Sequence, residues 1–138
     1  MRLADPAVQA YLATKEVVVL ATLRPDGAPV ATPMWFLPTP DAVFMLSVAD
    51  THKVEHLRRD PRVSVAAEST GPEGIRGVVV QGRAEFLPDG PERRDLAGRF
   101  LARYHPRLER LWGARAMPAD RVMFRIAPER VRGWGLSG

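Results

Sequence analysis

The spacing between the first two apolar runs restricts the folds that this chain can adopt. The run at 17–23, VVVLATL, is rich in β-branched residues, and the turn sequence RPDG separates it from a second run at 29–37. The five residues 24–28 can join antiparallel neighbours, whereas parallel strands need a crossover of about a dozen residues or more. The two runs therefore predict an antiparallel hairpin, and the continuous apolar character of the first run predicts a buried strand.

The rest of the chain repeats this pattern of short apolar runs separated by turns. Further strands are predicted at 42–48, 62–68, 75–87 and 121–128, with a loop at 69–74 and a tail after 128. Pro33 in the second run indicates an edge strand or a bulge. Gly77 and Gly82 in the long run indicate bulges or close backbone approach.

Helices are predicted at the edges of this strand series rather than between successive strands. Asp5 and Pro6 are typical of a helix start, and Asp50 or Thr51 is expected to cap a short helix that ends before Pro61. A later helix carries an apolar stripe that is interrupted at Pro106. Strand and helix do not alternate, so the sequence favours a mainly β antiparallel barrel or an α+β domain. One domain over 1–138 is expected.

The composition excludes several classes of protein and partner. Cysteine is absent, which excludes disulfides, zinc–thiolate sites and cysteine nucleophiles. No apolar run approaches the ~20 residues of a membrane span, and the N-terminus has no signal-peptide pattern, so we expect a cytoplasmic protein without a membrane partner. The net charge is only +4, without a basic block interleaved with aromatics. We therefore expect no nucleic-acid partner, whereas an anionic small ligand is compatible with this charge.

The strongest chemical signal lies in the segment SVADTHK, where a predicted strand gives way to the short helix. Lys53 lies just inside the helix start, where free N–H groups and the helix dipole favour phosphate. Thr51 and Ser47 add hydroxyl groups, and His52 adds a further donor. The alternative interpretation is an ordinary capped helix with a solvated lysine.

Three further patterns have simpler explanations than the sites they resemble. His52 and His56 are spaced as metal ligands can be, but they are equally typical of partly exposed polar residues on a surface turn, and we predict no metal site. The sequence RRDPR at 58–62 is typical of a helix end. GWGLSG at 133–138 matches G-x-G-x-x-G but has no helix after it, so no dinucleotide site is expected.

Two tryptophans are candidates for contact with a ligand or a partner. Trp35 follows Met34 on the second predicted strand, where it either packs in the core or lines a binding site. Trp134 lies between glycines near the C-terminus, so it is either exposed or docked on an aromatic ligand or a partner subunit.

Four segments, taken in order, resemble the pyridoxamine 5'-phosphate oxidase-like family of flavin and deazaflavin oxidoreductases. They are VLATLRPDGAPVATPMWF, FMLSVADTHKVEHLRRDPRVSV, VVVQGRAEFL and FRIAPERVRGWG, which together extend from about Val17 to Trp134. The resemblance implies a six-stranded antiparallel split β-barrel with flanking helices, assembled as a homodimer. It also implies a cleft between the subunits that binds FMN or the deazaflavin coenzyme F-420.

The resemblance assigns roles to particular residues of this cleft. It implies that the cofactor phosphate and ring contact the residues Thr32, Pro33, Met34, Trp35, Ser47, Thr51, His52 and Lys53, with Trp134 supplied by the partner subunit. The implied activity is hydride transfer to or from a small organic substrate, without an identified acid or base. The second strand carries no basic residue and His52 replaces an arginine, so the resemblance is to the short members rather than to the vitamin B6 oxidases. A flavin-binding module without turnover, or a haem-binding one with His52 or His56 as ligand, is the alternative.

Overall fold

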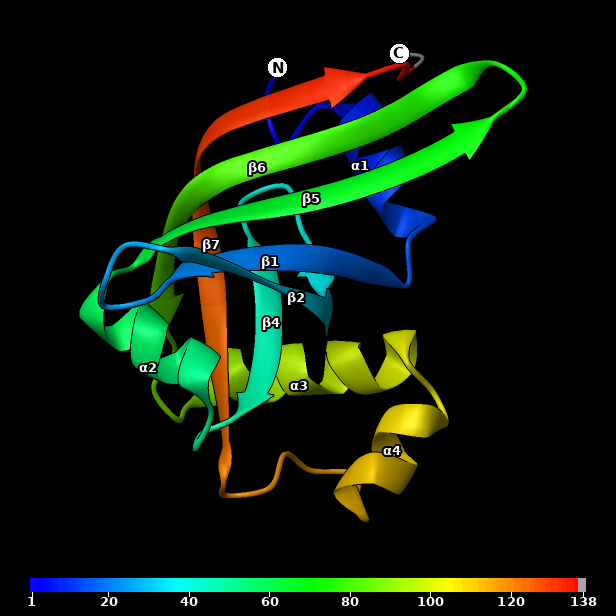
Figure 1. The fold of residues 1–138 in the computed structure, drawn as a ribbon. Helices are drawn as coiled ribbons and strands as arrows, with labels where there is room; N and C mark the ends of the chain where they lie inside the picture. Colours follow the sequence, from blue (N-terminus) through cyan, green and yellow to red (C-terminus); the bar gives the residue numbers. More distant parts are fainter. Residues whose placement is uncertain (137–138) are drawn as a thin grey trace.

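The structure, a computed structural model, describes residues 1–136, and its main element is one curved antiparallel sheet. In this part of the chain seven strands follow the order β2-β1-β5-β6-β7-β4-β3. Figure 1 shows the long strands β5, β6 and β7 curling over the shorter ones. The strands are β1 (Val17–Leu23), β2 (Pro29–Trp35), β3 (Leu37–Pro38), β4 (Val43–Val48), β5 (Arg62–Gly71), β6 (Gly74–Phe86) and β7 (Arg121–Trp134).

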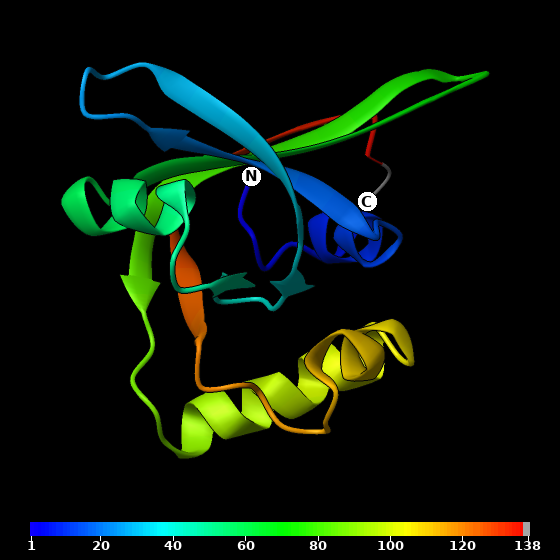
Figure 2. The same ribbon diagram turned by 60° about the horizontal axis from the view of Figure 1, so that its bottom comes forward.

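Four helices in residues 1–136 flank the sheet. They are α1 (Pro6–Ala13), α2 (His52–Arg59), α3 (Pro91–Arg103) and α4 (Arg107–Trp112). Figure 2 shows α3 and α4 together below the sheet, with α1 and α2 at opposite ends of the curved sheet. Among the described residues, no helix is both long and apolar enough to span a bilayer.

The prediction of a mainly β, antiparallel split barrel with flanking helices is confirmed, with one more strand than expected. The predicted strand 29–37 divides at Phe36, and its last part becomes the two-residue strand β3. The Phe36 N–H donates to the Tyr104 hydroxyl oxygen at 2.8 Å, so a side chain from the end of α3 replaces the ladder partner at this point. Tyr104 in turn lies within hydrogen-bond distance of the carbonyls of Phe36 and Glu16, at 2.9 and 2.8 Å.

The barrel is split because its two edges do not pair. Strand β2 forms one edge of the sheet and β3 the other, and in residues 1–136 no ladder joins β2 to β3 or β4. The edge position predicted from Pro33 is therefore confirmed. At the opening between β2 and β4 no backbone ladder among residues 1–136 closes the barrel wall, so side chains and helices lie there instead.

Two predicted irregular segments are regular strand in the structure. The predicted loop 69–74 is mostly β5 and β6, which continue to Gly71 and Gly74. The prediction of a tail after residue 128 is also wrong, because β7 continues to Trp134. β6 is long enough to pair with it that far, and Trp134 lies opposite Gly77. Trp134 is therefore held on a strand rather than in a flexible tail.

Gly77 and Gly82 lie where the backbone of a neighbouring strand comes close, as predicted. The register between β6 and β7 shifts at Gln81 and Gly82. A Cβ atom at Gly82 would lie 2.0 Å from the Ala127 carbonyl oxygen, and one at Gly77 would lie 2.9 Å from that of Ala67. Any side chain at Gly82 would therefore force the two strands apart.

The first strand is buried on one face only, which differs from the expectation of a fully buried strand. Val18 and Leu20 point into the barrel, whereas Val17 and Val19 are 41% and 39% exposed on the outer face. The inner side chains join those of α1 in the barrel core. A second cluster joins β4 to the apolar stripe of α3 and α4, in which Leu96, Phe100, Leu101, Tyr104 and Leu108 are buried as expected.

Candidate functional site

A cleft of about 410 Å³ lies at the split between β2 and β4. The two strand edges and the turn into α2 form one side, and α3 and α4 form the other. Its lining residues are Pro33, Met34, Trp35, Leu46, Ser47, Val48, Thr51, Lys53, Phe100, Leu108, Leu111, Trp112 and Arg121. The structure thus brings together most of the residues that the sequence identified, on the edge strand β2, on the part of β4 beyond its pairing with β3, and at the start of α2.

The turn from β4 to α2 forms a hydroxyl-lined end of the cleft. The Ser47 and Thr51 oxygens lie 3.3 Å apart, and both hydroxyls donate to the Val48 carbonyl, at 2.9 and 3.2 Å. Of the two residues predicted to cap α2, Asp50 and Thr51, the structure has Thr51 at the N-cap position. Its side chain makes no capping hydrogen bond to the first turn. The N-terminal end of α2 therefore keeps its partial positive charge beside the cleft.

Lys53 is a partly buried cation at this end. Burial lowers the pKa of its ammonium group, and no carboxylate contributes to the shift. Among residues 1–136 no ion pair of Lys53 is found, although eleven ion pairs occur elsewhere in that part of the chain. A bound anion would offset the cost of burying this charge.

Arg121 is a cleft residue that the sequence did not reveal. It begins β7 directly opposite Val48 of β4, and its side chain is only 17% exposed. Its guanidinium group is 2.6 Å from the carboxylate of Asp120. Its place in the cleft depends on the register between β4 and β7, for which the sequence offers no signal.

The other end of the cleft is aromatic and apolar. Trp35 stacks on Tyr104 with 4.4 Å between ring centroids and 7° between planes, and the Arg107 guanidinium lies 5.4 Å from the Trp35 centroid. Leu111 and Trp112 of α4 complete this wall, and Leu111 is 66% exposed. Trp35 thus both packs on a buried tyrosine and faces the cleft, which combines the two alternatives that the sequence left open.

Three of the predicted site residues lie outside the cleft. Thr32 lies on β2 opposite Leu20 and is half-buried. The His52 side chain is 94% exposed and lies 3.6 Å from Glu55. Trp134 is 50% exposed at the far end of β7, which Figure 1 shows at the top of the molecule while α4 lies at the bottom.

The histidine pair does not have the arrangement of a metal site. His56 is buried, with its Nδ1 3.0 Å from the Thr22 hydroxyl, so its prediction as a partly exposed residue is wrong. The reason is that the inner face of α2 packs on the barrel through His56 together with Val54 and Leu57. Within residues 1–136 no group of three metal-ligating side chains is present.

The arginines that end α2 make structural contacts. The Arg58 guanidinium lies 4.1 Å from the centroid of Phe86, and Arg59 donates to the Leu23 carbonyl. Arg62 donates to the carboxylate of Asp60 at 2.7 Å, and this hydrogen bond lowers the pKa of Asp60 to about 2. These contacts agree with the interpretation of RRDPR as a helix end.

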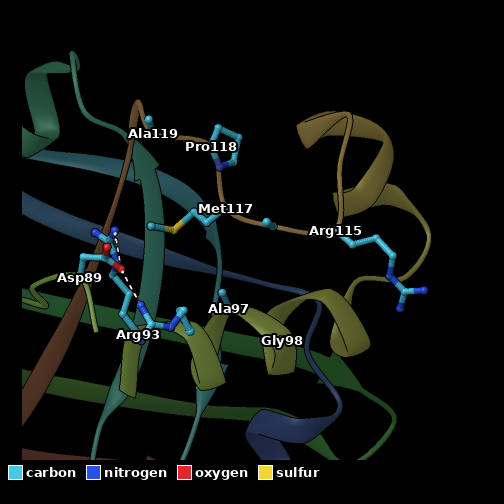
Figure 3. Close-up of a pocket in the computed structure, with 10 residues that line it drawn as sticks. Asp89, Arg93, Ala97, Gly98, Arg115, Met117, Pro118 and Ala119 are labelled. Atoms are coloured by element: carbon cyan, nitrogen blue, oxygen red, sulfur yellow. Dashed lines mark ion pairs between the residues drawn. The ribbon is translucent and has the colours of Figure 1, made fainter. Parts of the chain in front are cut away.

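A second cavity, of about 520 Å³, lies between α3 and the segment 115–119. Figure 3 shows Arg93 beside Asp89, with Arg115 directed away from them. Arg93 and Arg94 lie 3.5 and 3.6 Å from the same Asp89 carboxylate. One carboxylate thus faces two arginines there, and the lining of this cavity lacks the aromatic wall of the first cleft.

Comparisons with known proteins agree with this geometry. The sequence model of the pyridoxamine 5'-phosphate oxidase family matches residues 4–135. A FAD-binding protein of Mesorhizobium loti is 31% identical, with 91% of this chain and 87% of that chain covered and a TM-score of 0.71. A conserved hypothetical protein of Mycobacterium tuberculosis is 27% identical, with 94% and 83% covered and a TM-score of 0.79. No match was found among curated proteins.

One more distant structure has the same fold. The haem storage protein HutZ of Vibrio cholerae has a TM-score of 0.79 at 19% identity, with 99% of this chain and 98% of that chain covered. At this identity the likeness establishes the shared architecture alone.

Proposed function

Because the chain belongs to the pyridoxamine 5'-phosphate oxidase family, we propose that it binds a flavin-type cofactor, FMN or coenzyme F-420, in the cleft between β2 and β4. The observation that carries this proposal is the polarity of the cleft. A partly buried, unpaired Lys53 with hydroxyls lies at one end, and an aromatic wall lies at the other. A phosphorylated, ring-bearing molecule has the same two-part character.

The residues of the cleft would then bind and orient the cofactor. Lys53 and the hydroxyls of Ser47 and Thr51 hold the phosphate, with the start of α2 adding backbone donors. The edge of β2 at Pro33 and Met34 lies along the ring. The bound cofactor supplies the hydride chemistry, for transfer to or from a small organic substrate.

The protein itself contributes orientation rather than acid–base chemistry. Apart from Lys53 and Arg121, the lining residues are apolar or carry hydroxyl groups. The apolar side chains of α4 line the aromatic end of the cleft, beside the proposed position of the ring. We therefore propose that the protein is an oxidoreductase and that its substrate meets the cofactor beside α4.

A homodimer is part of the proposal, because large apolar side chains are exposed on the outer face of the sheet, among them Val17, Val19 and Trp134. Val19 lies opposite Ala66 on β5, Ala66 lies opposite Val79 on β6, and Val79 lies opposite Arg132 on β7. Side chains alternate along strands, so Trp134 lies on the same outer face as Val19. A partner subunit on this face would cover both and bring its own Trp134 towards a cleft that Trp134 of the same chain does not reach.

Replacing Val19 by lysine should convert the dimer into a monomer of about 15.3 kDa, because an unpaired charge would be buried at the interface. Sedimentation at micromolar concentration measures this change. The variant should remain folded, since Val19 is 39% exposed in the single chain. Ala102→Lys on the exposed side of α3 is the matched control and should leave the dimer intact. A wild-type protein that sediments only as a monomer would contradict the proposal.

The absorption spectrum of the purified protein, before and after incubation with FMN or with coenzyme F-420, tests the proposed cofactor. We expect the two-band spectrum of a flavin or the single violet band of a deazaflavin, with bleaching when a reductant is added. Failure of both cofactors to bind would refute the proposed function.

A binding module without turnover is the second candidate. His52, His56, Arg24 and Arg59 line a separate cleft of about 430 Å³ beside α2, where an imidazole and cations could meet a haem. A Soret band on haem addition, abolished by His52→Ala, would favour this candidate. A flavin that binds but accepts no hydride would favour a flavin carrier instead.

A further inference from the structure

The proposed cleft contains a second cation whose role the proposed function leaves open. Arg121 from β7 and Lys53 from α2 are the two charged residues of its lining, and no carboxylate lines it. The Asp120 carboxylate, next to Arg121 in the sequence, accepts a hydrogen bond from the Arg121 guanidinium at 2.6 Å. Asp120 is itself 67% exposed, so water screens its charge, whereas Arg121 is 17% exposed.

Both cations flank the turn between β4 and α2. Arg121 lies opposite Val48, and the Val48 carbonyl accepts a hydrogen bond from the Thr51 hydroxyl. Lys53 lies two residues after Thr51 in the sequence. The pairing of β4 with β7 fixes Arg121 on one side of this turn, and the first turn of α2 fixes Lys53 on the other. An anion seated on the Ser47 and Thr51 hydroxyls would therefore have cations on two sides.

We propose that Arg121 is a second anchor for the terminal phosphate of the cofactor, and that Arg121 and Lys53 together select a phosphomonoester, as in FMN, over a phosphodiester. This inference rests on the proposed function, since it assumes that a phosphate lies at this end. A phosphomonoester carries about −1.5 to −2 charges at pH 7, whereas a phosphodiester such as that of coenzyme F-420 carries one. A guanidinium can also bind two phosphate oxygens at once, and a diester has fewer free oxygens to offer.

Fluorescence titrations of the full chain with FMN, riboflavin and the methyl phosphate ester of FMN, a phosphodiester with one charge, test this proposal. Arg121→Gln should weaken FMN binding about 10-fold, the effect of losing one hydrogen bond to a charged group. Riboflavin, which lacks the phosphate, should bind the wild type and the variant equally. Arg121→Lys keeps the charge and should restore part of the FMN affinity. Arg99→Gln removes an exposed arginine of α3 and is the matched control.

The wild type separates failure of the proposed function from failure of this inference. Equal affinity for FMN and riboflavin in the wild type would refute the phosphate site itself. A wild type that prefers FMN, beside an Arg121→Gln variant with unchanged FMN affinity, would overturn only the role of Arg121. Equal losses for FMN and riboflavin would overturn it too, because Arg121 would then act through the fold or the ring. The methyl ester of FMN bound as tightly as FMN would overturn the selection for a phosphomonoester.

Discussion

Replacing Lys53 by alanine should weaken FMN binding about 10- to 100-fold, because each hydrogen bond to a charged phosphate contributes about 1.5–3 kcal/mol. Lys53 has no carboxylate partner among residues 1–136, so the substitution leaves no orphaned acid in that region. The apo fold should be as stable as the wild type or slightly more so, since removing the ammonium also removes the cost of burying it. Titration calorimetry measures the affinity and a thermal melt the stability.

Riboflavin is the informative control ligand for this variant. It lacks the phosphate, so its affinity should not change when Lys53 is removed, and equal losses for riboflavin and FMN would refute the phosphate site. Lys15, the other lysine of the chain, is not a suitable control residue. Its ammonium group donates to the Glu68 carbonyl and to the Ser69 hydroxyl, so its removal would loosen α1 from β5.

The phosphate contact should also depend on pH. Burial places the pKa of Lys53 below the usual lysine value of 10.5. Lys53 binds phosphate in its charged form, so the preference for FMN over riboflavin should be full below that lowered pKa and decline as pH rises through it. Bound phosphate raises the pKa of Lys53 again, so the decline should occur at higher pH in the complex than the pKa of the free protein would suggest. In Lys53→Ala this decline should be absent.

Replacing Trp35 by alanine should lower the free energy of unfolding by about 3 kcal/mol. This is the low end of the range for truncating a tryptophan, because the Trp35 side chain is half-buried. The substitution removes both the stack on Tyr104 and the contact with Arg107. The melting temperature should fall by roughly 10 °C. An unchanged melting temperature would show that the stack contributes little to the fold.

Trp35→Phe separates the packing role from a role in cofactor binding. A phenyl ring can still stack on Tyr104, so we expect most of the stability to return. Its smaller ring would leave a gap at the cleft wall, and the spectrum or affinity of the bound cofactor should change. A Trp35→Phe variant with wild-type binding would show that this tryptophan serves the fold alone.

The sequence predicts the strands and most of the cleft because those features depend on local patterns. The turn at 24–27 and the apolar runs around it determine the first hairpin, and the N-cap at Thr51 places Lys53 at the start of α2. The four segments that resemble the family, taken in order, also predict the family and its split barrel. The match to the family model confirms the family.

The errors concern features that depend on partners distant in the sequence. The strand character of 129–134 depends on the length of β6, and the burial of His56 depends on the Thr22 side chain, 34 residues earlier. Arg121 enters the cleft only through its register with Val48. None of these pairings leaves a local signal in the sequence.

The position of the cleft at the unpaired edges of the barrel has an evolutionary consequence. One wall consists of β2, β4 and the turn into α2, which carry the residues proposed to hold the cofactor. The other wall includes α4, a six-residue helix outside the sheet, preceded by Pro106 and followed by Gly113 in the left-handed conformation. Mutations at Leu111 or Trp112 can reshape this second wall without changing any residue proposed to hold the phosphate. On the proposed function, a lineage with this fold could therefore change its substrate while it keeps its cofactor.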